Sequence, residues 1–561
     1  MTYKFFGKEV SGPFTIPSGI LTTNTRTMKR IAQDVPQVGI ITTKSIGPEP
    51  RPGNREPIVH CLDEGRSGNF VNAVGLRNLG ADAFAEELAE LEDQLPDGRF
   101  LLASVFGSTP DEMCYVTERF DRYVNGHELN YSCPHSPGHG TTQGHDPDSV
   151  YKFTKAVRSK TLKPLLAKLS PNVGNVGEIA KAALRGGADG LVAINTVGPE
   201  VYRIDGHPIL TSKIGGSLSG PAIKERGLKV VKEIRRAVGS QYLKIVMGGI
   251  TTARDIEEYR DAAGNDEVLI GIGTATAGMS TKAMARYFPA LLYDLEHGTN
   301  TAEQYLVHNK SGHKRFGVRQ NHRLADGLHV ITLDGGFGIE PGQFAFAWIP
   351  GVAEKPYSLI ENDPATLIVQ VREGEDGKPG KLSTALARRE KGDVVYLRGP
   401  CGNAVELDGV HSAVLVGGGT GIAALYPIQR ALRARDARTT SFLGARDNDH
   451  LFYAKKFKDN GYTFLATDDG SLGFHGTVTE YLESTAGALE FDDSVFFNCG
   501  PRPMVERAEE IEREYASSKR ESIYSAVEEL TRCGYGLCGE CAREDGLRNC
   551  VDGPFMHPLD D

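Results

Sequence analysis

The sequence predicts an α/β protein of several domains, of which the first is a closed (β/α)8 TIM barrel. Its 561 residues exceed what one hydrophobic core holds, since domains average about 150 residues and a barrel about 250. Over the first 295 residues, short runs of β-branched and apolar side chains alternate with stretches of helical periodicity. Runs that are apolar at nearly every position are typical of parallel strands buried on both faces, as in such a barrel.

Eight such runs occur, which is the number of strands that the barrel requires. In chain order they are PFTIPSGI (13–20), VGIITTKS (38–45), FLLASVFG (100–107), ELNYSC (128–133), PLLAKLS (164–170), GLVAINT (190–196), LKIVMGGI (243–250) and EVLIGIGTA (267–275). Helical stretches separate them. In NVGEIAKAALRGG, for example, Ile179, Ala182 and Ala183 fall on one helical face.

The pattern changes after a polar segment over 296–314, which we expect to be a linker. Residues 315–410 alternate short strands with turns, as a small antiparallel β-barrel does. Residues 411–518 open with a strand, a glycine turn and a helix, and further buried strands follow, which predicts a doubly wound α/β domain. Residues 519–561 hold four of the nine cysteines and are expected to form a small metal-binding segment.

The composition excludes several classes of function. The chain is 40% hydrophobic and 24% charged, and its formal net charge of -10 gives no field that would attract a phosphate backbone. The sequence contains no stripe of Lys and Arg interleaved with aromatics, no run of about 18 apolar residues and no signal-peptide pattern. We expect a cytoplasmic protein that binds neither nucleic acid nor membranes.

Polar side chains and glycines gather at the carboxyl ends of the predicted barrel strands, where TIM barrels place their active sites. They are Ser18, Lys44, Ser45, Asn130, Cys133, Lys168, Asn195, Thr196, Gly248, Gly249, Gly273 and Thr274. Amides, hydroxyls and lysines suit a planar anionic substrate. Glycine turns after the last two strands suit a cofactor phosphate that is held by backbone N–H groups.

Seven motifs then follow one another in a fixed order: TKSIGPEPRPGN, NAVGLRN, NYSCPH, AKLSP, INT, GGSLSGPAIK and MGGI. Over residues 1–290 they resemble the class 1 dihydroorotate dehydrogenases, which are FMN enzymes of pyrimidine synthesis. The resemblance implies that Lys44, Asn72, Gly75, Leu76, Asn130, Asn195 and Thr196 surround orotate. It implies that Ser18, Ser45, Lys168, Ile194, Gly220, Gly248, Gly249, Gly273 and Thr274 hold FMN.

The same resemblance implies a catalytic role for Cys133, the cysteine of the NYSCPH motif. In the family this cysteine removes a proton from C5 of dihydroorotate while a hydride leaves C6 for the flavin. A thiol has a reference pKa of about 8.5, so it needs a nearby positive group, such as Lys44 or Lys168, or hydrogen bonds to become a thiolate near neutrality. From the residue alone, a buried core cysteine is the alternative.

Two positions depart from the family pattern. His135 stands where the family has an Asn that touches substrate, and Ser104 stands where an Asn faces the flavin. His135, His139 and His145 lie together in one predicted loop and could bind a metal. Histidine and glycine in a loop over a barrel mouth are, however, more typical of a lid.

The segment PGQFAFAWIPGVAEKPYSL resembles the flavin-binding barrel of the ferredoxin reductase superfamily, in particular the electron-transfer subunit that accompanies class 1B dihydroorotate dehydrogenase. The resemblance implies FAD at Lys355, Pro356, Tyr357, Ser358, Ser383 and Thr384. Lys355 replaces the usual arginine, which keeps the charge and loses the bidentate fork. A plain β-barrel with an exposed KPYS turn is the alternative.

GGGTGIAAL (417–425) follows a buried strand and opens a helix, so its N–H groups could contact a dinucleotide diphosphate. NCGPRPM (498–504) resembles the turn of the same superfamily whose cysteine lies beside nicotinamide. Together they imply an NAD site at Gly417, Gly418, Gly419 and Cys499, with ordinary sheet turns as the alternative. Arg446 and Asp447 give opposing signals about NAD and NADP.

CGYGLCGEC (533–541) and a later cysteine form the pattern C-x4-C-x2-C plus a distal Cys, which is the plant-type 2Fe-2S arrangement. Structural zinc sites usually take C-x2-C pairs from two places. The predicted ligands are Cys533, Cys538, Cys541 and Cys550. Zinc and free thiols are the alternatives.

The two resemblances together imply one chain that oxidises dihydroorotate to orotate and passes electrons from FMN through 2Fe-2S to FAD and NAD+. By family analogy we expect a homodimer or a higher homo-oligomer. Two alternatives stay open: an NAD(P)H-linked reductase of another pyrimidine-like cyclic imide, and an electron carrier within a larger redox complex.

Overall fold

The computed structural model describes residues 3–62, 68–131, 144–307, 312–373, 377–489, 491, 493–515 and 520–559. The chain forms two compact units. The first comprises Met1–Gly312 and Tyr535–Leu547, and the second comprises His313–Gly534 and Arg548–Asp561. The cysteine-rich segment near the C-terminus therefore contributes residues to both units.

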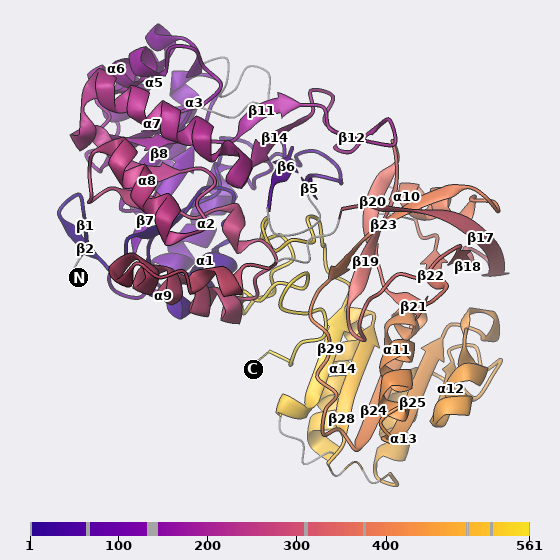
Figure 1. Ribbon diagram of the computed structural model, residues 1–561. Coiled ribbons are helices and arrows are strands. Elements are labelled where there is room, and N and C mark those ends of the chain that lie inside the picture. Colours follow the sequence, from indigo (N-terminus) through magenta and orange to yellow (C-terminus); the bar gives the residue numbers. More distant parts are fainter. Residues whose placement is uncertain are drawn as a thin grey trace. The chain divides into compact units, whose positions relative to one another are not determined.

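Eight parallel strands close into a barrel in the first unit (Figure 1). They are β3 (Phe14–Ile16), β4 (Val38–Thr42), β7 (Phe100–Val105), β8 (Gly126–Asn130), β9 (Leu165–Lys168), β10 (Gly190–Ala193), β15 (Leu243–Met247) and β16 (Leu269–Gly271). Each strand pairs with the next along the chain, and β16 pairs with β3 to close the ring. Every strand falls within or overlaps one of the eight predicted runs, so the barrel prediction is confirmed.

The helices between the strands surround the barrel (Figure 1). They are α1 (Thr25–Asp34), α2 (Ala81–Glu92), α3 (Pro110–Phe120), α5 (Pro147–Arg158), α6 (Val176–Arg185), α7 (Lys224–Val238), α8 (Ala253–Ala263) and α9 (Thr281–His297). Several begin at a capping side chain: Thr109 accepts from the N–H of Glu112, and Thr252 forms a capping box with Asp255. On α6, Ile179, Ala182 and Ala183 are buried, as their spacing predicts.

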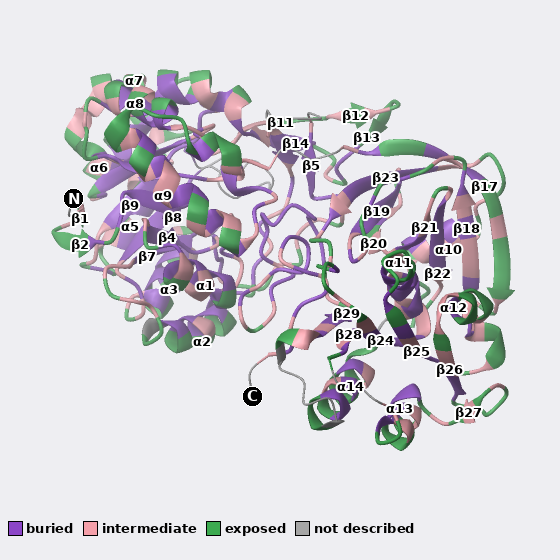
Figure 2. Ribbon diagram, turned by 60° about the horizontal axis from the view of Figure 1, so that its bottom comes forward, coloured by how far each residue is buried: buried purple, intermediate pink, exposed green. Residues whose placement is uncertain are grey.

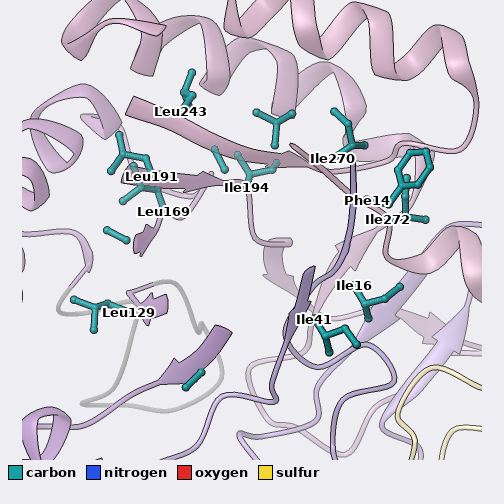
Figure 3. Packing of buried hydrophobic residues seen from close by; sticks show 14 of the residues in the cluster. Phe14, Ile16, Ile41, Leu129, Leu169, Leu191, Ile194, Leu243, Ile270 and Ile272 are labelled. Atoms are coloured by element: carbon teal, nitrogen blue, oxygen red, sulfur yellow. The ribbon is translucent and has the colours of Figure 1, made fainter. Parts of the chain in front are cut away.

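The strands are buried on both faces, as the purple barrel ribbons in Figure 2 show. Outward-facing side chains such as Phe14, Leu129 and Ile270 pack in the layer between strands and helices (Figure 3). A separate cluster contains inward-facing residues, among them Leu102, Leu166, Val192 and Ile245. The strands of a terminal hairpin, β1 (Tyr3–Phe5) and β2 (Lys8–Val10), add Phe5 and Val10 to this inner cluster, so apolar side chains close one end of the barrel.

A second sheet of the first unit was not predicted. Its four antiparallel strands, in the order β11-β14-β6-β5, are β5 (Val59–Cys61), β6 (Phe70–Asn72), β11 (Val197–Glu200) and β14 (Gly216–Ser219). They lie in the connections that follow β4 and β10, which leave the carboxyl ends of the barrel strands. These strands have three or four residues and lie outside the eight apolar runs that mark the barrel strands, so the sequence predicts loops there.

The second unit contains a seven-stranded antiparallel sheet with the order β20-β19-β23-β17-β18-β22-β21. Its strands are β17 (Lys314–Ala325), β18 (Leu328–Leu333), β19 (Phe344–Ile349), β20 (Ala353–Tyr357), β21 (Leu359–Asn362), β22 (Ala365–Gln370) and β23 (Val394–Cys401). A short helix, α10 (Lys381–Ala387), packs against it, and Leu382 and Leu386 of this helix belong to the same apolar cluster as the strands. The predicted antiparallel domain is confirmed.

A six-stranded parallel sheet follows, in the order β27-β26-β25-β24-β28-β29. Its strands are β24 (Ser412–Gly418), β25 (Arg438–Ala445), β26 (Tyr462–Thr467), β27 (Phe474–His475), β28 (Val495–Gly500) and β29 (Ile523–Val527). One face packs on α11 (Ile422–Arg433) and α12 (Ala454–Asn460), the other on α13 (Val478–Ala486) and α14 (Arg502–Tyr515). The first strand, β24, lies inside the sheet. The strands that follow it are added first on one side, up to β27, and then on the other side, as β28 and β29. The predicted doubly wound sheet is therefore confirmed, and its switch point lies between β24 and β28.

None of the helices in the described ranges is both long and apolar enough to cross a membrane.

A buried ionic cluster lies within the antiparallel sheet. The carboxylate of Glu354 accepts hydrogen bonds from Arg398 Nε at 2.7 Å and Nη2 at 2.6 Å, and His313 Nε2 lies 2.6 Å from its Oε1. All three side chains are at most 1% exposed, and the guanidinium of Arg398 lies 4.0 Å above the ring centre of Phe346. Burial opposes ionisation of Glu354, but Arg398 and His313 outweigh it and lower the pKa of its carboxyl to about 2.

We predict that Glu354→Gln destabilises the second unit by about 3–5 kcal/mol, because Arg398 would stay buried without its counter-ion. Trp348 is the only tryptophan and packs 4.5 Å from the ring of His313, so its fluorescence reports urea denaturation locally. The exposed pair Arg507 and Glu483 supplies the control, since Glu483→Gln should cost less than about 1 kcal/mol. Equal losses in the two variants would contradict the prediction.

The same cluster predicts a pH dependence. The folded carboxyl of Glu354 has a pKa of about 2, below its ordinary value of 4.5, so the folded state binds fewer protons than the unfolded state in this range. Its stabilising contribution is therefore complete above pH 4.5 and is lost as the pH falls toward 2. The difference in stability between the wild-type chain and Glu354→Gln should shrink over that interval.

Candidate active site in the barrel

A pocket of the first unit lies at the carboxyl ends of the barrel strands. Every described barrel residue that the sequence assigned to orotate or FMN lines it. These are Ser18, Lys44, Ser45, Asn72, Gly75, Leu76, Asn130, Lys168, Ile194, Asn195, Thr196, Gly220, Gly248, Gly249, Gly273 and Thr274. Cys133, His135 and His139 lie outside the described residues, and the described chain before them ends at Tyr131, one residue past Asn130.

The charge of the pocket favours an anionic ligand. Lys44 and Lys168 line it, and the described lining residues include no Asp or Glu. The remaining wall combines amides and hydroxyls with apolar side chains such as Val59, Phe70 and Met247. A flat ring system that carries a phosphate or a carboxylate fits this combination, because the apolar walls cover the ring and the lysines attract the charged group.

A hydroxyl network orients the polar groups on one side of the pocket. Asn130 Nδ2 donates to Ser45 Oγ at 2.8 Å, and Ser45 Oγ lies 3.0 Å from Ser18 Oγ and 2.9 Å from Ser104 Oγ. Ser104 is fully buried on β7 and does not line the pocket. Its hydroxyl contacts Ser45 rather than the pocket itself, which gives a structural role to this departure from the family pattern.

The glycine turn after β15 allows the backbone to approach closely. Gly249 has φ of +76°, and a Cβ there would lie 2.7 Å from the carbonyl oxygen of Gly220. Gly248 has φ of +129°, and its carbonyl accepts a hydrogen bond from Tyr259 Oη at 2.7 Å, which fixes the turn. Side chains at positions 248 and 249 are thus disfavoured, and the backbone of this turn can approach a ligand in the pocket closely. Binding of a phosphate by backbone N–H groups requires such an approach.

The sequence did not predict that Leu537 and Cys538 line the same pocket. Hydrogen bonds hold this segment to the barrel within the first unit: Leu21 N donates to Leu537 O at 2.7 Å, Thr23 Oγ1 to Cys538 O at 2.5 Å and Asn24 Nδ2 to Gly539 O at 2.8 Å. About five hundred residues separate the partners along the chain, so no local pattern could have paired them.

The four predicted metal ligands are all buried. Cys538 and Cys541 belong to the first unit, and Cys533 and Cys550 belong to the second. Among the described residues, no group of three or more His, Cys, Asp or Glu side chains is arranged so that it could hold a metal. Beside Cys533, Gly534 has φ of +73° and packs so tightly that a Cβ would lie 2.6 Å from the ring of Phe346.

A second pocket lies in the second unit, at the carboxyl ends of the parallel sheet. Gly418 and Gly419 line it, together with Arg446 and Asp468, which follow β25 and β26. Gly417 and Cys499 do not line it. A Cβ on Gly417 would contact Leu425 and Ile422 of α11, so that glycine serves the packing of strand and helix.

The glycine turn and the turn at Cys499 touch each other. A Cβ on Gly421 would lie 2.3 Å from the carbonyl oxygen of Cys499, so only glycine fits there. Burial raises the pKa of the Cys499 thiol to about 12, and Cys499 is therefore a neutral thiol at neutral pH. Arg446 faces the pocket, whereas Asp447 caps the following turn and accepts from the N–H of His450 at 3.0 Å.

The residues assigned to FAD lie on a strand of the antiparallel sheet, just after it, and on the helix that packs against the sheet. Lys355, Pro356 and Tyr357 are in β20 and Ser358 follows them, while Ser383 and Thr384 are in α10. None of them lines the second pocket. The Thr384 hydroxyl is buried and has no hydrogen-bond partner among the described residues, as expected of a group that is satisfied by a ligand.

A (β/α)8 barrel with a cationic, partly apolar pocket at its strand ends is the architecture of an enzyme. The family described as "Dihydroorotate dehydrogenase" matches residues 1–286. The "Dihydroorotate dehydrogenase B (NAD(+)), catalytic subunit" of Methanocaldococcus jannaschii is 40% identical over 275 residues, which are 48% of this chain and 86% of that protein. The protein of the same description from Thermoplasma acidophilum is 39% identical over 278 residues, 49% of this chain and 87% of its own length. The chain belongs to the dihydroorotate dehydrogenase family and is an oxidoreductase.

Two solved structures show weaker similarity. The NADH-dependent reduced ferredoxin-NADP oxidoreductase is 25% identical with a TM-score of 0.38, over 43% of this chain and 87% of that one. DHODH from Eimeria tenella, solved with ferulenol, is 20% identical with a TM-score of 0.44, over 54% of this chain and 87% of its own.

We predict that Gly421→Ala destabilises the second unit by about 1–3 kcal/mol, because its Cβ would displace the turn at Cys499. Gly487→Ala is the matched control, since a Cβ at Gly487 meets nothing within 4 Å. Urea denaturation followed by Trp348 fluorescence measures both. A Gly421→Ala chain as stable as the control would show that the two turns do not touch.

Proposed function

We propose that the chain oxidises dihydroorotate to orotate in the barrel pocket. The observation that carries this proposal is the convergence of sixteen assigned residues on the lining of one pocket. Thirteen of them come from the seven motifs, and the other three are Ser18, Gly273 and Thr274. The two lysines of the pocket and the absence of carboxylates among the described lining residues suit an anionic substrate and a phosphate-bearing cofactor. The family membership of residues 1–286 supports the same reaction.

Within this pocket we assign Lys44, Asn72 and Asn195 to the anionic, hydrogen-bonding substrate. Lys168 and the turn at Gly249 are assigned to FMN, which, when bound, supplies the acceptor for the hydride. The ring would lie against the apolar wall, and the phosphate would meet backbone N–H groups where the glycines leave room. This division is the one that the resemblance to the dihydroorotate dehydrogenase family implies.

Cys133 is the proposed base that takes the substrate proton. This role rests on the NYSCPH motif, in which Cys133 follows Asn130 by three residues. Asn130 lines the pocket, and Lys44 and Lys168 in its wall are the cations that would favour a thiolate there.

The second half of the chain is proposed to carry the electrons away. We assign FMN to residues 1–295, FAD to 315–410, NAD+ to 411–518 and a 2Fe-2S cluster to 519–561. Cys538 lines the barrel pocket, so a cluster bound through this cysteine would have one of its ligands at the FMN site. The switch-point pocket at Gly418 and Gly419 suits the dinucleotide diphosphate.

Cofactor analysis of the purified chain tests this scheme directly. We expect one FMN, one FAD and two irons with two acid-labile sulfides per chain. Released flavins are separated by chromatography, and iron, zinc and sulfide are assayed on the same sample. One flavin together with zinc would contradict the proposed electron path.

Replacement of the proposed base tests the reaction itself. Cys133→Ser should lower turnover with dihydroorotate by about 10²- to 10⁴-fold, because a hydroxyl is a far weaker base at neutral pH. FMN content should stay unchanged. Cys114→Ser is the control, since Cys114 is buried on α3 and does not line the pocket. Full turnover in Cys133→Ser, or oxidation of dihydrouracil in preference to dihydroorotate, would contradict the proposal.

A further inference from the structure

A carboxylate is buried inside the barrel beneath the pocket. Leu129 of β8 points outward into the layer of helices, so by alternation Glu128 and Asn130 point inward. Asn130 lines the pocket, and Glu128 lies one layer deeper. Its register partner on β9, Leu166, belongs to the inner apolar cluster, and Glu128 itself is fully buried. The sequence gives no hint that this glutamate is anything other than a strand residue.

Among the described residues, Glu128 makes one ionic contact, which is with Lys168. Its Oε1 lies 3.7 Å from Lys168 Nζ, with 1% and 5% of the two side chains exposed. That distance is too long for a hydrogen bond, and neither carboxylate oxygen has a hydrogen-bond partner among the described residues. Burying a charged group is costly unless an opposite charge lies nearby. The contact between Glu128 and Lys168 therefore offsets part of the cost of burying both charges.

The pair of Glu128 and Lys168 is separated by a longer distance than the buried pair of Glu354 and Arg398. Glu354 accepts two hydrogen bonds from Arg398 at 2.7 Å or less, and both groups are thereby fully engaged. The ammonium of Lys168 is not bound to Glu128 in this way. It lies above the carboxylate and also lines the pocket, so its hydrogen atoms are available to a ligand there.

We propose that Glu128 is a positioning residue that holds the Lys168 ammonium at the floor of the pocket and offsets its charge. This inference rests on the proposed function, in which Lys168 contacts FMN. FMN gains negative charge when it is reduced, and a nearby cation stabilises the reduced form. A carboxylate behind that cation weakens this effect, so Glu128 holds the equilibrium of the bound flavin closer to the oxidised form.

The test is a redox titration of the FMN-loaded chain against reference dyes. Glu128→Gln keeps the shape of the side chain and removes its charge. It should shift the equilibrium of bound FMN about tenfold toward the reduced form, which is about 30 mV for a two-electron couple. Glu128→Asp keeps the charge and should stay within about threefold of the wild-type chain.

Asp121 supplies the matched control. Its carboxylate contacts His127 of the same strand at 2.9 Å, on the outer face of the barrel, and does not line the pocket. Asp121→Asn should leave the flavin equilibrium unchanged. If Glu128→Gln does not fold, the double variant Lys168→Met/Glu128→Gln, which leaves neither buried charge, is compared with Lys168→Met instead.

In the Lys168→Met background, the added Glu128→Gln change should shift the equilibrium less than about threefold, because the cation that Glu128 offsets is gone. A wild-type equilibrium in FMN-loaded Glu128→Gln would overturn the inference, and so would a full tenfold shift in the Lys168→Met background. Absence of FMN from the purified wild-type chain would overturn the proposed function instead. The two failures are therefore distinguishable.

Discussion

The site depends on the closure of eight parallel strands into a ring. Because all strands run in one direction, their carboxyl ends meet at one rim, and residues far apart in the sequence come together there. Lys44 follows the second strand, Lys168 ends the fifth and Gly249 follows the seventh. Without closure these groups would lie along the edge of an open sheet. With closure they line a single pocket.

Glu354 and Glu128, two of the buried glutamates, show that the same residue type can have different roles. Glu354 is bonded on every side by Arg398 and His313, and its carboxyl has a strongly lowered pKa, so it stabilises the sheet and offers nothing to a ligand. Within the described part of the chain, Glu128 has one ionic partner, Lys168 at 3.7 Å, and it lies under a pocket. The number of hydrogen bonds around each carboxylate, rather than its burial, separates a structural role from a functional one.

Much of the fold could be predicted because the barrel strands are buried on both faces and read as unbroken apolar runs. The polar residues at their ends follow from the same pattern, and all of those described line one pocket. Strands such as β5 and β6 have three residues each and carry no periodic signal. Leu537 joins the pocket through a hydrogen bond to Leu21, and such a contact depends on tertiary structure alone. The role of Glu128 was likewise invisible, since only the register of β8 shows which way its side chain points.

The hairpin of β1 and β2 limits the side from which ligands can reach the barrel pocket. Phe5 and Val10 belong to the apolar cluster that fills the barrel interior below the pocket, so the described residues close this end of the barrel. Ligands of the pocket therefore enter and leave on the side of the carboxyl ends of the strands. A substrate and its product would have to exchange on that same side.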